Sequence, residues 1–138
     1  MKIALLGAAA ILAFAPSAFA ETQTYKADLK ASSEVPPNDS KGSGALTATY
    51  DTATKKLTYS ATYKDLTGPA TAAHFHGPAA AGANAGVSVP VKDITPSPLK
   101  GEATLTDDQA KQLQGGQMYF NIHTAANKGG EIRGQVTK

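Results

Sequence analysis

Two of the three histidines in this chain stand two residues apart, in the segment Thr71–Pro78 (Thr-Ala-Ala-His-Phe-His-Gly-Pro). In an extended strand, successive side chains point to opposite faces, so His74 and His76 would share one face while Ala73 and Phe75 occupy the other. Imidazole nitrogens are common protein ligands for copper and zinc. A His-x-His pair on a strand therefore offers two nitrogen ligands to a metal ion.

The third histidine lies in a second alternating segment, Gln117–His123. Its even-numbered residues are apolar and its odd-numbered residues polar, so Asn121 and His123 are expected on the face turned away from the core. Met118 belongs to the apolar face and is interpreted as a core residue, not as a copper ligand. If the fold places the two segments side by side, three imidazoles could hold one metal ion.

Further polar residues in the last alternating segment could support such a site. Glu131 and Arg133 flank Ile132, so both are expected on the polar face beside His123. Together with Asn121 they are candidates for groups that hydrogen-bond to a ligating imidazole and orient it. Alternatively, Glu131 pairs with Arg133 or a lysine, and the histidines only hydrogen-bond between strands and fix their register. The residue pattern leaves both interpretations open.

Alternation with a period of two recurs along the chain, in short segments separated by glycine and proline. Such segments are typical of half-buried β-strands. The expected strands cover residues 24–30, 46–50, 57–63, 71–76, 87–91, 101–105, 117–123 and 131–137. Pro90 interrupts the fifth of them, so that strand is expected at a sheet edge.

One short helix is expected between about Asp107 and Gln114. Thr106 and Gln109 match the capping box that begins helices, and Gly115 provides a stop. Eight short strands without β-α-β alternation favour an all-β fold, an antiparallel β-sandwich. Two long loops, Ser32–Gly44 and Gly77–Gly86, are expected beside it.

Residues 1–20 have the three parts of a secretory signal peptide: Lys2, the apolar run Ile3–Phe14 and the small-x-small sequence Ala18-Phe19-Ala20. We therefore expect a periplasmic or secreted protein whose single domain covers residues 21–138. The apolar run is too short to span a membrane.

Charge and cysteine content exclude several kinds of partner and site. Without Lys2, 12 basic residues stand against 11 acidic ones, which gives no reason to expect nucleic acid as a partner. The chain has no cysteine, which excludes thiolate metal ligands and thiol nucleophiles.

Several segments resemble the CHRD domain family: Ala73-His74-Phe75-His76-Gly77-Pro78, Tyr119–Thr124, Gly129–Gln135 and, near the start, Glu34-Val35-Pro36-Pro37. The resemblance covers nearly all of the expected mature chain and suggests a bacterial, exported, single-domain member. It implies an immunoglobulin-like β-sandwich and no particular activity. The growth-factor binding of chordin, for which the family is named, does not transfer by fold alone.

Two functions are consistent with these residues. In the first, an exported, non-enzymatic protein binds a metal ion, copper or else zinc, through His74, His76 and His123. In the second, the chain is a module that contacts another exported protein, binds no metal, and uses its histidines structurally. An enzyme is disfavoured because no catalytic triad, phosphate loop or acid pair is recognisable. A superoxide-dismutase-like copper site would need more imidazoles than three.

Overall fold

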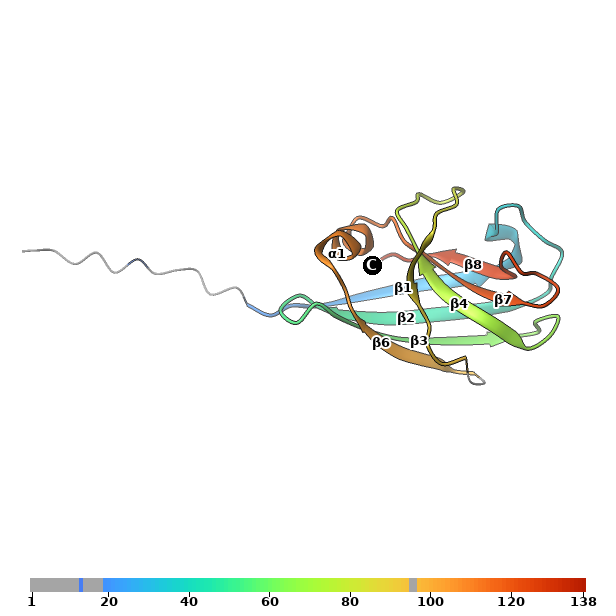
Figure 1. Ribbon diagram of the computed structural model, residues 1–138, viewed down its shortest axis with the longest axis horizontal. Coiled ribbons are helices and arrows are strands. Elements are labelled where there is room, and N and C mark those ends of the chain that lie inside the picture. Colours follow the sequence, from blue (N-terminus) through green and yellow to red (C-terminus); the bar gives the residue numbers. More distant parts are fainter. Residues whose placement is uncertain (1–12, 14–18, 95–96) are drawn as a thin grey trace, which may run out of the picture.

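The computed structural model describes residue 13, residues 19–94 and residues 97–138, and its eight strands form one antiparallel sheet (Figure 1). The predicted signal peptide, residues 1–20, lies almost entirely outside the described residues. The elements in chain order are β1 (Thr22–Lys30), a 3-10 turn η1 (Ala31–Ser33), β2 (Ser43–Asp51), β3 (Lys56–Lys64), β4 (Ala70–His76), β5 (Val87–Pro90), β6 (Leu99–Thr104), α1 (Asp107–Gln114), β7 (Tyr119–Thr124) and β8 (Ile132–Gln135).

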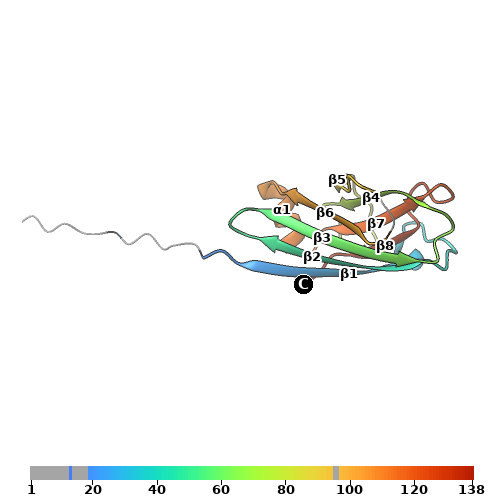
Figure 2. The same cartoon turned by 90° about the horizontal axis from the view of Figure 1, so that it is seen from below.

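The sheet has the strand order β5-β4-β7-β8-β1-β2-β3-β6 and curls into a nearly closed, flattened barrel. Figure 2 shows β1, β2 and β3 along one side, and β4 and β7 along the other. The prediction of an all-β antiparallel fold is confirmed. The immunoglobulin-like sandwich is not confirmed, because the strands belong to one continuous sheet and not to two separate ones.

The two sides of the barrel are joined at a sparse seam between β1 and β8. The seam consists of the registered pair Lys30 and Arg133 and of an isolated bridge between Lys26 and Thr137. Gly134 lies in this seam against the carbonyl group of Asp28, so closely that a Cβ atom would overlap it. A glycine is therefore required where β8 approaches β1.

Alternation along each strand places the apolar side chains in the barrel interior, as the sequence predicts. The Phe75 ring is fully buried and meets the Tyr59 and Phe120 rings edge to face, with centroids 5.1 and 4.9 Å apart. Burying each such ring contributes roughly 2–3 kcal/mol to folding. This aromatic contact packs β3 on one side of the barrel against β4 and β7 on the other.

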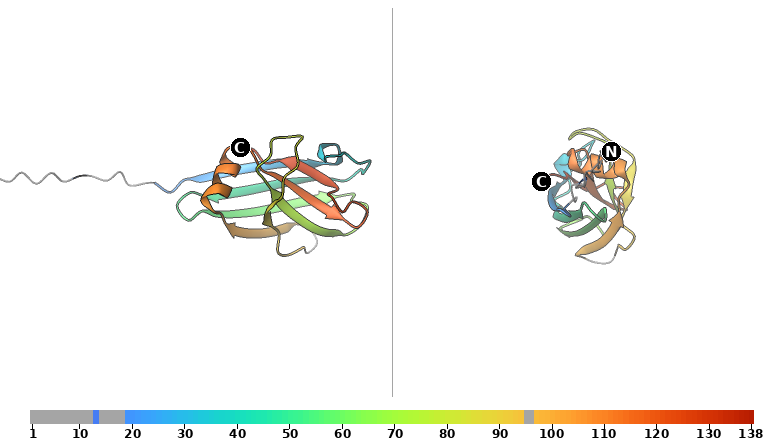
Figure 3. Two further views of the ribbon diagram at one scale, coloured as in Figure 1. Left: turned by 45° about the horizontal axis from the view of Figure 1, so that its top comes forward. Right: turned by 90° about the vertical axis from the view of Figure 1, so that its left-hand side faces the viewer.

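The predicted helix is confirmed, and α1 covers the end of the barrel where β1 begins (Figure 3). Both halves of the capping box are present: the Thr106 hydroxyl accepts from the Gln109 backbone N–H, and the Gln109 side chain accepts from the Thr106 backbone N–H. Ala110 and Leu113 face the core. Pro90 lies in β5, which is an edge strand as expected. Among the described residues, no helix is long and apolar enough to cross a membrane.

Candidate metal centre

The three histidines come together because β4 and β7 are neighbours in the sheet. Register pairs His74 with Asn121 and places His123 opposite Ala72, one step along the same face. One ring nitrogen from each histidine lies within 4.8 Å of the others. The expectation that the fold places the two segments side by side is confirmed.

Three contacts in the cluster have the spacing of ligands in a coordination site, while the three ring nitrogens together spread to 4.8 Å, so the rings must draw together around an ion. His74 Nδ1 lies 3.1 Å from His123 Nε2. Asn121 Oδ1 lies 2.9 Å from His76 Nε2 and 2.9 Å from His123 Nε2. Four ligands bound tetrahedrally at about 2.0 Å would be about 3.3 Å apart, so these contacts resemble edges of a coordination polyhedron.

The polar face that carries the cluster is largely covered, and only His74 remains partly exposed, whereas the sequence predicts an open face. His76 and His123 are each 8% exposed, and every residue of β7 is buried. Two loops cover this face: His76 Nδ1 lies 2.9 Å from the Ala85 carbonyl oxygen, and His123 Nδ1 lies 2.7 Å from that of Lys128. The imidazoles therefore belong to a small polar core outside the barrel, and His74 is the most exposed of them.

Arg133 lies on this polar face, as predicted, but hydrogen-bonds to none of the three histidines among the described contacts. Its guanidinium carbon lies 3.4 Å above the centre of the Tyr119 ring, and that ring stacks on the His76 ring at 4.6 Å. Arg133 also donates to Asn84 Oδ1 at 2.8 Å and to the Ala83 carbonyl group. It therefore holds the covering loop and Tyr119 in place, and Tyr119 in turn fixes the plane of His76.

Glu131 lies elsewhere, and the prediction that it shares the polar face with His123 is wrong. Its fully buried carboxylate accepts hydrogen bonds from the Ser40, Thr124 and Asn127 side chains and from both the hydroxyl and the backbone N–H of Thr67. The alternative pairing with Arg133 or a lysine is wrong as well, since no ion pair of Glu131 occurs among the described residues.

The prediction for Glu131 fails because of the local backbone conformation. Gly130, immediately before Glu131, has a φ of +125°, so the regular pleat of β8 begins only at Ile132. Burial acts to raise the pKa of Glu131, but the hydrogen bonds from Thr67, Thr124 and Asn127 outweigh it and lower the pKa to about 2. Glu131 is therefore an ionised structural carboxylate behind β7.

A second buried acid, Glu34, was not among the predicted site residues. It is 5% exposed, and burial raises its pKa to about 6, although Asn121, Arg133 and the Val35 backbone act to lower it. Among the described residues, Glu34 Oε1 has no hydrogen-bond partner. The signal in the sequence is that this acid stands in Glu34-Val35-Pro36-Pro37, one of the segments that resemble the CHRD domain family.

Burial also affects the histidines that would have to be neutral to bind a metal ion. It lowers the pKa of His74, as do the nearby His123 and His76, and it lowers the pKa of His76 despite hydrogen bonds to Ala85 and Asn121. A lowered pKa keeps an imidazole neutral at more acidic pH. Protons should therefore compete with a metal ion for His74 and His76 at lower pH than for a histidine with the ordinary pKa of about 6.5.

We accordingly expect the loss of Cu(II) affinity to occur at lower pH than in a site where His74 and His76 had the ordinary histidine pKa. Titrations of the purified protein with Cu(II) between about pH 4.5 and 7.5, corrected for the metal affinity of the buffer, would measure this. A midpoint at or above the ordinary histidine pKa would contradict the burial of the site.

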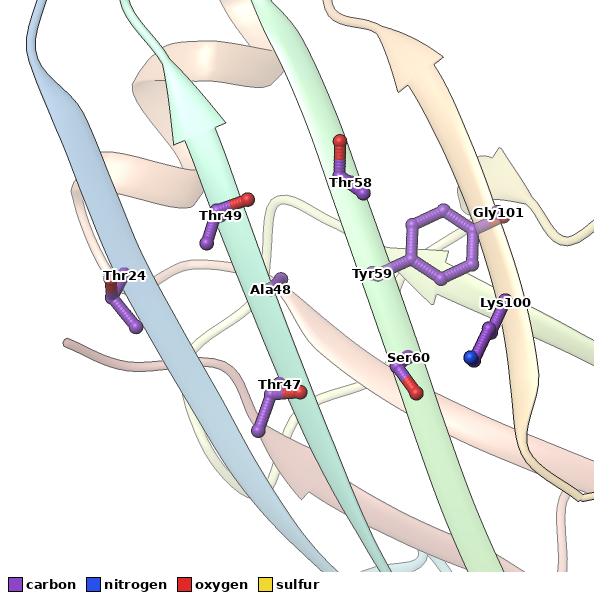
Figure 4. Close-up of a pocket in the computed structure, with 9 residues that line it drawn as sticks. All are labelled: Thr24, Thr47, Ala48, Thr49, Thr58, Tyr59, Ser60, Lys100 and Gly101. Atoms are coloured by element: carbon purple, nitrogen blue, oxygen red, sulfur yellow. The ribbon is translucent and has the colours of Figure 1, made fainter.

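A groove on the outer face of β1, β2, β3 and β6 is a weaker candidate for a functional site than the histidine cluster. Figure 4 shows the hydroxyl groups of Thr49, Thr58 and Ser60 along it, with Lys100 at one side. Neither a histidine nor a carboxylate lines this groove. The imidazoles that could bind a metal ion lie on the opposite side of the barrel, on β4 and β7.

Comparison with known proteins identifies the family of the chain. No curated protein and no solved structure matches this chain. The family model described as CHRD domain matches residues 25–136, a span that includes the three histidines, Asn121 and Glu34. The chain therefore belongs to the CHRD domain family.

Proposed function

We propose that this chain is an exported, non-enzymatic protein that binds one transition-metal ion, copper in preference to zinc, through His74, His76 and His123. Asn121 Oδ1 provides a fourth, oxygen ligand. Export is inferred from the signal-like pattern of residues 1–20.

The observation that carries this proposal is a shortage of protons in the cluster. The three rings make five short contacts: one between His74 and His123, two with Asn121 Oδ1, and two with the carbonyl oxygens of Ala85 and Lys128. Each contact needs one hydrogen, but three neutral imidazoles carry only three N–H groups. Adding protons would place imidazolium cations side by side in a buried site, which is costly.

A metal cation removes this shortage. The ring nitrogens of His76 and His123 that face the carbonyl oxygens keep their hydrogens, which leaves both Nε2 lone pairs directed at the cluster. With its hydrogen on the outer nitrogen, His74 adds the Nδ1 lone pair. The contacts inside the cluster then become contacts between ligands of one ion. Ligating histidines in proteins characteristically donate their second N–H to a carbonyl or carboxylate in this way.

The ligand set favours copper. Three imidazole nitrogens and an amide oxygen suit Cu(II) or Zn(II), and the described cluster contains neither thiolate nor thioether. At a given nitrogen and oxygen site, affinity for divalent ions rises to Cu(II) and falls at Zn(II). Zinc is therefore the second ion to test.

The competing function is a protein interaction module with a purely structural histidine network. In that arrangement the Asn121 amide is turned round, so that its NH2 group donates to His76 and His123. The amide oxygen then faces the Gly129 carbonyl oxygen and Glu34, and Glu34 must be protonated to donate to it. The raised pKa of Glu34 is the observation that favours this alternative.

A Cu(II) titration of the metal-free protein near pH 7 distinguishes the two functions. We expect one Cu(II) per chain and an electron paramagnetic resonance spectrum with coupling to three nitrogens. The matched control is a triple variant, His74→Asn, His76→Asn and His123→Asn, which should bind no copper with comparable affinity. Equal binding by parent and triple variant, or no binding by the parent, would support the interaction module instead.

A further inference from the structure

Glu34 is a buried acid next to the proposed ligands, and none of the contacts described so far explains it. It follows η1, in the loop between β1 and β2, and is 5% exposed. Among the described residues it forms no ion pair, and its Oε1 atom is buried without a hydrogen-bond partner. A buried carboxylate oxygen without a partner is unfavourable, so it calls for an explanation.

The position of this oxygen points to Asn121. A Cβ atom placed on Gly130 would lie 2.5 Å from Glu34 Oε1 and 2.6 Å from Asn121 Nδ2. The carboxylate and the amide NH2 group therefore face each other across the space that glycine leaves free. The other acceptor near Asn121 Nδ2 is the Gly129 carbonyl oxygen, at 3.5 Å. Acceptors on this side of the amide favour the orientation in which Oδ1 points at the imidazoles.

The charge of a bound metal ion gives a second, independent reason to assign Glu34 to the metal centre. A divalent ion held by three neutral imidazoles and a neutral amide keeps its full charge of +2 in a largely buried site. Arg133, which is 2% exposed and stacks on Tyr119, adds a positive charge nearby. Glu131 is engaged in its own hydrogen bonds behind β7. Glu34 is the carboxylate that faces the cluster.

We propose that Glu34 is the positioning and charge-compensating residue of the metal centre: its carboxylate accepts from Asn121 Nδ2, directs Oδ1 to the ion and offsets part of the ion's charge. This inference rests on the proposed function. It explains why an acid is buried here although Arg133, the nearby positive charge, forms no ion pair with it: the metal ion is the second cation.

Two substitutions of Glu34 separate the effect of its charge from its effect on the orientation of the Asn121 amide. Glu34→Gln keeps an oxygen that can accept from Asn121 and removes the charge, whereas Glu34→Leu removes both. We expect Glu34→Gln to weaken Cu(II) binding about 10-fold and Glu34→Leu up to about 100-fold, the range found for groups that support metal ligands. The spectrum should keep coupling to three nitrogens in both variants, and its metal hyperfine splitting should change in Glu34→Leu.

The matched control is Glu102→Gln, which removes the same charge from an exposed ion pair with Lys56 on β3. It should leave copper affinity unchanged. Asn121→Asp places a negative charge on the fourth ligand, and it should raise affinity more in Glu34→Gln than in the parent, which a merely structural role for Glu34 does not predict.

The outcomes distinguish this inference from the proposed function. If the parent binds Cu(II) and Glu34→Gln binds it equally well, or if Glu102→Gln weakens binding as much, the role of Glu34 is overturned and the histidine site stands. If the parent binds no Cu(II), the proposed function fails and this inference fails with it. Circular dichroism of each variant checks that a loss of affinity is not a loss of folding.

Discussion

Replacing His123 by alanine is expected to lower Cu(II) affinity by at least about 100-fold, because supporting groups alone account for about 10- to 100-fold at metal sites. His123 is the central ring of the cluster. Its Nε2 atom contacts both His74 and Asn121, and its Nδ1 atom is anchored to the Lys128 carbonyl group. Its loss removes one metal ligand and also the ring that connects His74 to Asn121.

A graded series tests this prediction. His74 contacts only His123 among the hydrogen-bonding groups of the cluster and is the most exposed ring, so His74→Ala should cost less affinity than His123→Ala. Titration of the parent and both variants with Cu(II) in the presence of a competing chelator would rank their Cu(II) affinities. Equal losses, or a larger loss for His74→Ala, would contradict the central place of His123.

The same variants report on stability, since the polar face is buried. His123 is 8% exposed and donates to a backbone carbonyl group, so His123→Ala should lower the unfolding free energy of the metal-free protein by about 1–2 kcal/mol. Urea denaturation with a chelator present would measure this. The variant should remain folded, and complete unfolding would mean that the histidines are chiefly structural.

Replacing Glu131 by glutamine is expected to lower the unfolding free energy by about 3 kcal/mol, with no effect on copper affinity. The carboxylate accepts five hydrogen bonds, among them the Thr67 backbone N–H at 2.9 Å and Asn127 Nδ2 at 2.8 Å. A glutamine NH2 group would face donors, and its neutral oxygen accepts more weakly than a carboxylate.

The stability that Glu131 provides should depend on pH in a defined direction. Because folding lowers the pKa of Glu131 to about 2, the ionised carboxylate stabilises the fold above its ordinary pKa, and this stabilisation is lost as pH falls towards 2. The difference between parent and Glu131→Gln should therefore be largest near neutral pH and shrink below about pH 4. Glu102→Gln, at an exposed ion pair, should cost under about 1 kcal/mol and serves as control. A pH-independent difference would contradict the role of the charge.

Alternation was sufficient to predict the strands and the shared face of His74, His76 and His123, because side-chain direction in a strand depends only on local backbone geometry. The capping box at Thr106 predicted the helix. It failed at Glu131, where the positive φ of Gly130 interrupts the pleat. It could not predict Glu34, which meets Asn121 across 87 residues of sequence through the folded barrel. The carbonyl groups of Ala85 and Lys128 are common to every residue type, so no side-chain pattern marks them as partners of the imidazoles.

Local opening of the barrel is expected to begin at the seam between β1 and β8, because β1, β2 and β3 are held together by nine paired residues at each junction, whereas the seam has one registered pair and one bridge. The histidines lie on β4 and β7, on one side of this seam, while Glu34 follows β1 on the other. The segment that contains Glu34 is nevertheless tied to the histidine side, because Asn38 donates to the Glu131 carbonyl group and Asn84 donates to that of Val35. Opening of the strand pairing alone would thus leave Glu34 beside Asn121, and a bound ion would keep its compensating charge until these loop contacts break as well.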